Sequence, residues 1–218
     1  LLRPDLDVLR RGVEDGRRTF ANTLKYIGIT TSANFGNMVS MALGTLFLPF
    51  LPLAAKQILL NNFLSDLPSI AISTDRVDAD RLATPQRWQV GELRHFMIVF
   101  GLLSTAFDLL TFVLLHRWFR ADEATFQTAW FTVSLLTELT VVLVLRTRGA
   151  FWRSAPSRLL LAATAAVGAV ALLLPWLAPV RSLFGFVELA PAMLGTLGAV
   201  VLAYLVCNEA IKRRIGAA

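Results

Sequence analysis

Apolar residues in this 218-residue chain are gathered into six blocks of roughly 20, a grouping that limits the possible folds more than any other feature of the sequence. About 20 apolar residues in a helix span the hydrocarbon core of a bilayer. The chain is 56% hydrophobic and only 17% charged, whereas an ordinary soluble domain carries about 25% charged residues. We therefore predict an all-α, polytopic membrane protein with six transmembrane helices, at Tyr26–Leu48, Leu53–Ile72, Phe96–Leu115, Phe126–Leu145, Leu159–Trp176 and Leu189–Cys207.

Basic residues lie at the edges of these blocks, so the net charge of +6 indicates membrane topology and not nucleic-acid binding. If both termini are cytoplasmic, 17 of the 21 Lys and Arg residues fall on the cytoplasmic side and four on the outer side. The positive-inside rule therefore places both termini in the cytoplasm. We expect a cytoplasmic stalk segment at 1–25, a membrane domain at 26–211 and a cytoplasmic tail at 212–218.

Cysteine and histidine are too few for two common kinds of site. Cys207 is the only cysteine, and His95 and His116 are the only histidines. A disulfide framework and a multi-histidine metal site are therefore excluded within this chain. Membrane lipid is the expected surrounding partner, and no nucleic-acid partner is expected.

Polar side chains interrupt the first two predicted spans at helical spacing. The first span carries Asn34 and Asn37 on one face, and the second carries Asn62, Ser65 and Asp66 on one face. A carboxylate near mid-span costs roughly 2.5 to 3.5 kcal/mol, so an intramembrane acid indicates function. Amide, hydroxyl and carboxylate oxygens are the ligands of a hard cation, which favours a cation site where the two spans meet.

Pro68 lies two residues after this acid and has no N–H to offer the carbonyl of Leu64. We expect the freed carbonyl to sit in irregular backbone beside the cation site, because such backbone is tolerated at membrane depth only where it is buried or lines a cavity.

Other polar residues in the spans have competing interpretations. Asn34, Asn37 and Asn61 could serve only as interhelical hydrogen-bond donors and acceptors. Asp108 in the third span and Glu138 in the fourth could be packed or paired acids, and Glu138 is the better candidate ligand because it lies deeper in its span.

A longer connection from Ser73 to Arg94 follows the second span and reads as a cytoplasmic loop. It carries three aspartates within six residues, which are Asp75, Asp78 and Asp80. We expect these side chains to form a solvated face of the loop and not a metal site.

Three segments carry a resemblance to a known family. They are GRRTFANTLKYIGITTSANFGN at 16–37, LLNNFLSDLPSIAISTDRVD at 59–78, and PQRW from Pro85. The chain resembles the carboxy-terminal membrane region of P-type cation-transporting ATPases, most closely the bacterial magnesium-translocating branch. The resemblance implies that the six spans correspond to the fifth through tenth membrane helices of the family, in the bacterial inner (plasma) membrane.

The resemblance also implies ligands and partners. Asn34, Asn37, Asn62, Ser65 and Asp66 fall at cation-site positions, and Glu138 is similar to an acid that calcium-transporting relatives place on the eighth helix. Magnesium-type members often lack that acid, so its presence bears on the identity of the ion. Mg²⁺ is the transported ion that the resemblance implies, and the partners are the parent's remaining transmembrane and cytoplasmic domains.

The chain lacks the DKTG phosphorylation motif and a GxxxxGK loop. We therefore expect ATP to be used only by missing domains of the parent, and the chain to be a fragment of a longer product. Two alternatives stay open: a stand-alone membrane scaffold, whose polar residues only join helices, and a passive ion channel subunit, which would pass ions without ATP.

Overall fold

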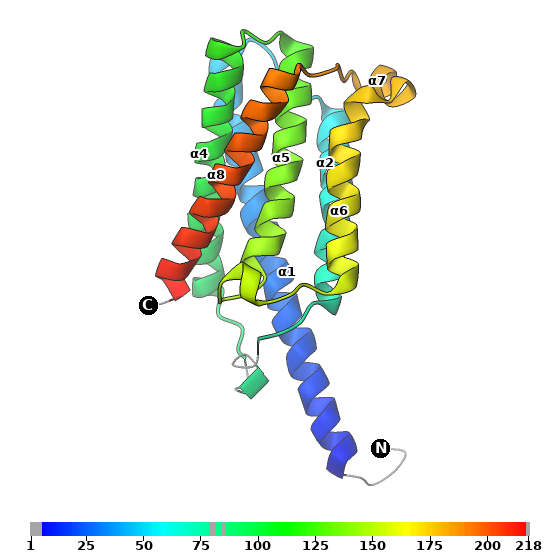
Figure 1. The fold of residues 1–218 in the computed structure, drawn as a ribbon. Helices are drawn as coiled ribbons and strands as arrows, with labels where there is room; N and C mark the ends of the chain where they lie inside the picture. Colours follow the sequence, from blue (N-terminus) through cyan, green and yellow to red (C-terminus); the bar gives the residue numbers. More distant parts are fainter. Residues whose placement is uncertain (1–5, 79–81, 84–85, 217–218) are drawn as a thin grey trace.

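The computed structural model describes residues 6–78, 82–83 and 86–216, and those residues form helices and connecting segments without a β-strand. Six helices of 16 to 42 residues form a bundle (Figure 1). Their bounds are α1 (Leu6–Phe47), α2 (Ala55–Ala71), α4 (Val90–Val113), α5 (Glu123–Leu145), α6 (Arg158–Leu173) and α8 (Pro191–Gly216). A short helix, α7 (Ala178–Phe184), lies at one end of the bundle beside the top of α6. The all-α fold class is confirmed.

Short helical segments extend or connect these elements. They are η1 (Ile72–Thr74), η2 (Leu114–Trp118), η3 (Phe151–Arg153) and η4 (Leu174–Trp176). Local sequence explains several boundaries. The Asp122 side chain accepts a hydrogen bond from the Thr125 amide at the start of α5, and Ser157 does the same for Leu160 at the start of α6. Gly185 ends α7 with a positive φ of 75°, which glycine adopts without strain.

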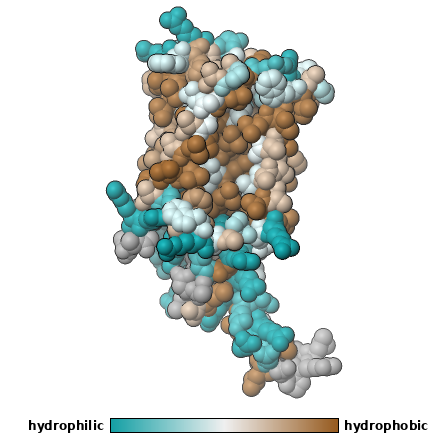
Figure 2. Space-filling model, in the orientation of Figure 1, coloured by the Kyte–Doolittle hydropathy of each residue, from teal (hydrophilic) through white to brown (hydrophobic). Residues whose placement is uncertain are grey.

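By length and composition, four of the described helices could cross a membrane: Val90–Trp118, Glu123–Leu145, Arg158–Trp176 and Pro191–Ile215. These correspond to the last four predicted spans. Most of each of the first two predicted spans is also helical, in α1 and α2, but these helices carry the polar residues noted above. The face of the bundle seen in Figure 2 is largely hydrophobic between two more polar ends. The chain is thus an integral membrane protein, while the six-span count and the side of the termini stay predictions.

Helix α1 is continuous for 42 residues and extends well beyond the bundle at its N-terminal end (Figure 1). The expected boundary between stalk and membrane domain at residue 26 does not coincide with a break in this helix. The last turns of α8 lie at the same end of the bundle as the protruding part of α1. A rigid helix therefore connects this end of the molecule to the polar residues at Asn34 and Asn37.

Small residues allow α1 and α4 to cross closely. A Cβ added to Gly36 would lie 2.8 Å from the Cβ of Ser104, and one added to Gly101 would lie 2.5 Å from Cδ1 of Phe35. Small residues at such crossings let helix backbones approach in membranes. Helix α5 is the most buried of the four apolar helices and packs against α1, α2, α4, α6 and α8.

Candidate cation site

A cavity of about 670 Å³ opens between α1, α2 and α5. Its lining includes all six residues predicted as cation ligands, which are Asn34, Asn37, Asn62, Ser65, Asp66 and Glu138. Asn61, Ser134 and Trp130 also contribute to the wall. The tertiary fold therefore brings together polar residues that are as much as 104 positions apart in the sequence, from Asn34 to Glu138. Their role as ligands stays a prediction.

One carboxylate oxygen connects the three helices. Oε1 of Glu138 accepts a hydrogen bond from Nδ2 of Asn37 at 2.5 Å and another from Nδ2 of Asn61 at 3.0 Å. The Ser134 hydroxyl donates to Oδ1 of Asn37 at 3.4 Å. None of the ion pairs found among the described residues includes Glu138. Its charge is therefore approached by amides and not by a basic side chain.

Asn61 belongs to this arrangement, although the sequence left it as a possible interhelical hydrogen-bonding residue. Its side chain is only 2% exposed and makes that hydrogen bond to Glu138. Its Oδ1 atom is buried without a hydrogen-bond partner in the part of the chain that the structure describes. Asn61 lies four residues before Ser65, so helical spacing alone could have added it to the polar face.

The other predicted ligands are more open. Asn34, Asn62 and Asp66 are exposed, and the partly buried Ser65 donates its hydroxyl to the Asn62 carbonyl at 3.1 Å. Exposed amides and a carboxylate at membrane depth need a polar or protein environment. The cavity therefore has one wall closed by Glu138 and one side that presents polar groups outward.

The expected backbone irregularity at Pro68 is not found. Helix α2 continues through Pro68 to Ala71 and then passes into η1. The α-helix thus accommodates the proline without unwinding at this position. The backbone beside Asp66 is therefore regular helix.

The two other acids of interest have different surroundings. Asp108 on α4 is buried and accepts hydrogen bonds from Ser40 and Trp130. Asp75 follows η1, and its side chain is 0% exposed. The expectation that Asp75 forms part of a solvated loop face is therefore wrong.

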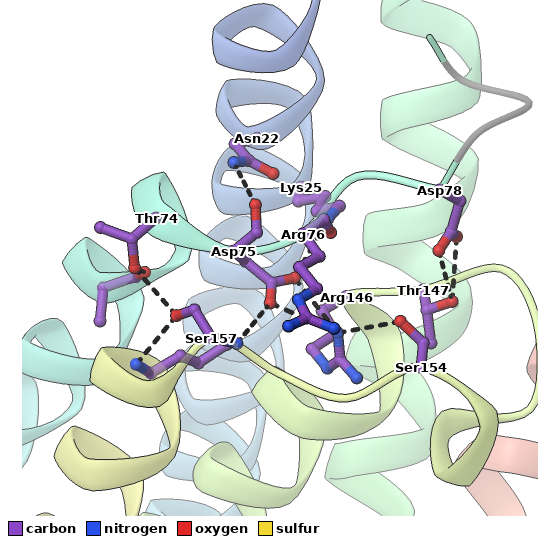
Figure 3. A network of polar contacts seen from close by, with 12 residues as sticks. Asn22, Lys25, Thr74, Asp75, Arg76, Asp78, Arg146, Thr147, Ser154 and Ser157 are labelled. Carbon is purple, nitrogen blue, oxygen red and sulfur yellow. Dashed lines mark hydrogen bonds and ion pairs between the residues drawn. The ribbon is translucent and has the colours of Figure 1, made fainter.

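Asp75 is the centre of a buried group of charges, which we call the Asp75 cluster: Asn22, Lys25, Asp75, Arg146 and Ser157 (Figure 3). Nζ of Lys25 lies 3.1 Å from Oδ2 of Asp75, and Nη1 of Arg146 lies 3.3 Å from Oδ1. Both basic side chains are only 1% exposed. The backbone amide of Ser157 donates to Oδ1 at 3.2 Å. The cluster therefore joins α1, the segment after α2, the end of α5 and the start of α6.

Backbone contacts complete the attachment of this segment to α1. Asn22 donates to the carbonyl of Asp75 at 2.9 Å and to that of Ser73 at 3.1 Å, and Lys25 donates to the carbonyl of Arg76 at 2.7 Å. Asp78 is partly buried and accepts from the Thr147 hydroxyl at 2.9 Å and from the Arg148 amide at 3.1 Å. Asp80 lies outside the described residues. The described part of the loop is therefore bound to the bundle through Asp75 and Asp78.

Comparison with known proteins places this geometry in context. Residues 50–214 match the family model described as "Cation transporting ATPase, C-terminus". The chain is 40% identical over 217 residues to "Magnesium-transporting ATPase, P-type 1" of Escherichia coli (strain K12), an alignment that covers 97% of this chain and 24% of that protein. A protein of the same name from Salmonella typhimurium (strain LT2) is 34% identical over 218 residues, covering 98% and 24%. The chain thus spans about a quarter of the length of these relatives.

Proposed function

The chain belongs to the family of cation-transporting ATPase C-terminal domains, and on this premise we propose that it forms part of the intramembrane cation site and translocation path of an ATP-driven magnesium pump. The observation that carries the proposal is the convergence of Asn37, Asn61 and Glu138 on one cavity that also holds Asp66.

The chemistry of the cavity suits a hydrated divalent cation. Asp66 and Glu138 together supply two negative charges, which match the charge of Mg²⁺. Asn34, Asn37, Asn62 and Ser65 supply neutral oxygens that can replace or hold its water. Mg²⁺ keeps several waters when proteins bind it, and a cavity of about 670 Å³ has room for them, because a water occupies about 30 Å³ in the liquid.

In the proposed topology, α1 and α2 are the first two of six transmembrane helices and both termini are cytoplasmic. The open side of the cavity, with Asn34, Asn62 and Asp66, is then covered by the remaining transmembrane helices of the parent protein. That cover removes the cost of exposing polar groups to lipid. We place the complete pump in the bacterial inner membrane.

ATP is used by cytoplasmic domains of the parent in this proposal. The continuous helix α1 provides the mechanical connection, because its protruding end and its site residues belong to one rigid element. Movement of the stalk would displace Asn34 and Asn37 relative to Glu138 on α5. Such a displacement would change the affinity for the cation.

The test is Asp66→Asn in the full-length protein that contains this chain. We expect magnesium-stimulated ATP hydrolysis to be abolished while the protein still folds, because the amide removes a charge without changing the size of the side chain. The matched control is Asp122→Asn at the start of α5, where asparagine caps a helix as well as aspartate does. Undiminished magnesium stimulation in Asp66→Asn would overturn the site assignment. Ion flux without ATP in liposomes containing this chain alone would favour a channel.

A further inference from the structure

The side-chain amide of Asn61 is held against Glu138 in one orientation. Asn61 lies on α2 and is only 2% exposed, and its Nδ2 donates a hydrogen bond to Oε1 of Glu138 at 3.0 Å. An ionised carboxylate only accepts hydrogen bonds, so the nitrogen of the amide faces it and the oxygen does not. The Oδ1 atom of Asn61 therefore has to find a different partner.

Asn37 and Asn61 donate to the same oxygen of Glu138, but they differ in how their own carbonyl oxygens are used. Oδ1 of Asn37 accepts a hydrogen bond from the Ser134 hydroxyl at 3.4 Å. Oδ1 of Asn61 is buried and meets no hydrogen-bond donor within residues 6–78, 82–83 and 86–216. Buried acceptors without a partner are rare and costly in folded proteins. Of these two amides, that of Asn61 is the one whose oxygen is free to bind a ligand.

The backbone of α2 is fixed one turn before Asn61. Gln57 is 0% exposed, its Oε1 accepts from the Ala54 amide at 2.9 Å, and its Nε2 donates to the Phe184 carbonyl at 3.0 Å. Rotation about χ2 of an asparagine exchanges its oxygen and nitrogen, which have nearly the same shape, and the preferred angles are roughly two-fold. The amide of Asn61 can therefore turn over without a shift of the helix. The turn breaks no hydrogen bond of Oδ1 to the described part of the chain.

The distance between Asn61 and Glu138 fits two adjacent ligands of one Mg²⁺ ion. Mg²⁺ demands an octahedron of ligands at about 2.0–2.1 Å, in which neighbouring oxygens lie about 2.8–3.0 Å apart. Nδ2 of Asn61 lies 3.0 Å from Oε1 of Glu138. When the amide turns over, Oδ1 takes the place of Nδ2, and Mg²⁺ between the two oxygens replaces the hydrogen bond. Asn37 keeps its own hydrogen bond to Oε1 in this arrangement.

We propose that Asn61 is a selectivity residue of the cation site, whose amide turns over so that its Oδ1 and Oε1 of Glu138 bind Mg²⁺ directly as adjacent ligands. The proposal rests on the proposed function, because it requires Mg²⁺ in the cavity. Ca²⁺ takes six to eight oxygen ligands at about 2.3–2.6 Å in flexible geometry, so the loss of one ligand matters less to it. Asn61 therefore contributes more to the affinity for Mg²⁺ than to the affinity for Ca²⁺.

Equilibrium binding of Mg²⁺ and of Ca²⁺ to the full-length pump, measured by calorimetry without ATP, tests the proposal. The binding that is lost in Asp66→Asn identifies the contribution of the cavity. Asn61→Leu keeps the approximate size of the side chain but offers no oxygen. We expect it to lower the affinity for Mg²⁺ about tenfold and to change that for Ca²⁺ by less than about twofold. The preference for Mg²⁺ should therefore fall about fivefold or more.

A second variant, Asn61→Asp, separates a cation ligand from a residue that only positions Glu138. A carboxylate cannot donate a hydrogen bond to Glu138, but it presents an oxygen to the cation in either orientation. We expect this variant to keep the wild-type preference for Mg²⁺ over Ca²⁺ and at least the wild-type affinity for Mg²⁺. Equal losses of Mg²⁺ affinity in Asn61→Leu and Asn61→Asp would show that Asn61 only donates to Glu138, which overturns the proposal. An unchanged preference in Asn61→Leu overturns it as well.

Unfolding measured without divalent cations shows whether Asn61→Leu folds. If it does not, Asn61→Ser replaces it with the same expected result, because the serine hydroxyl is too short to reach an ion beside Oε1 of Glu138. A wild-type pump that binds Mg²⁺ no better than Asp66→Asn overturns the proposed function instead, so the two failures are distinguishable.

Discussion

Two buried acids of this molecule, Glu138 and Asp75, have opposite electrostatic surroundings. The hydrogen bonds found for Glu138 come from the amides of Asn37 and Asn61, whereas Asp75 is surrounded by Lys25, Arg146 and backbone donors. A carboxylate whose charge is already balanced by two bases holds segments together. A carboxylate approached only by neutral donors keeps its charge available for a cation. The difference agrees with a structural role for the Asp75 cluster and with the ligand-binding role proposed for the Glu138 cavity.

The largest expected effect on stability is that of Asp75→Asn. It leaves Lys25 and Arg146 buried without their acid, and breaking a buried ion pair in this way costs about 3–5 kcal/mol. Thermal or denaturant unfolding of the purified full-length protein measures the loss. The control is Asp7→Asn, whose ion pairs with Arg10 and Arg11 are exposed and contribute about 1 kcal/mol at most. Equal effects of the two substitutions would contradict a structural role for the Asp75 cluster.

Glu138→Gln should act on ligand binding and not on folding. The amide oxygen of glutamine can still accept from Asn37 and Asn61, while the buried charge is removed. We expect magnesium affinity to fall roughly 10- to 100-fold, since a contact with a charged group contributes about 1.5–3 kcal/mol. The magnesium dependence of ATP hydrolysis measures the affinity, and unfolding without magnesium should be unchanged. A loss of stability as large as that of Asp75→Asn would remove the distinction between the two regions.

Gly36→Ala tests the position of α1, because it changes no charge in the Asp75 cluster or in the Glu138 cavity. The new Cβ would lie 2.8 Å from the Cβ of Ser104, and such overpacking typically costs about 1–3 kcal/mol. Asn37 is the next residue, so magnesium affinity should also fall. The Asp75 cluster should be unaffected, because Lys25 lies 11 residues earlier, about 16 Å along the helix.

The control for this substitution is Gly198→Ala in α8, where an added Cβ meets no atom within 4 Å. It should be neutral or stabilising by up to about 1 kcal/mol. Hydrolysis assays at varied magnesium and unfolding measurements on both variants check the prediction. Unchanged magnesium affinity in Gly36→Ala would show that the cavity tolerates displacement of α1.

Much of the lining of the candidate cation site could be predicted from local sequence. Polar residues in an apolar helix are conspicuous, and helical spacing indicates which of them share a face, as for Asn62, Ser65 and Asp66. Asp75 could not be recognised in the same way, because its charged neighbours in the loop suggest solvent. Its partners Lys25 and Arg146 are 50 and 71 residues away. Glu138 and Asp108 likewise appear equivalent in the sequence, as two acids within apolar spans.

By itself, the sequence determined the all-helical membrane class and the set of candidate ligands, because hydrophobic blocks and i, i+3 and i, i+4 spacings depend only on residues near one another in the chain. Only the tertiary structure decided which carboxylates are balanced by bases and which are not. That outcome depends on which helices pack together, since the charge next to a buried acid comes from another helix. The packing of α1, α2 and α5 gives Glu138 its amide partners. At one end of the bundle, α1 and the end of α5 give Asp75 its bases, and the start of α6 adds a backbone amide.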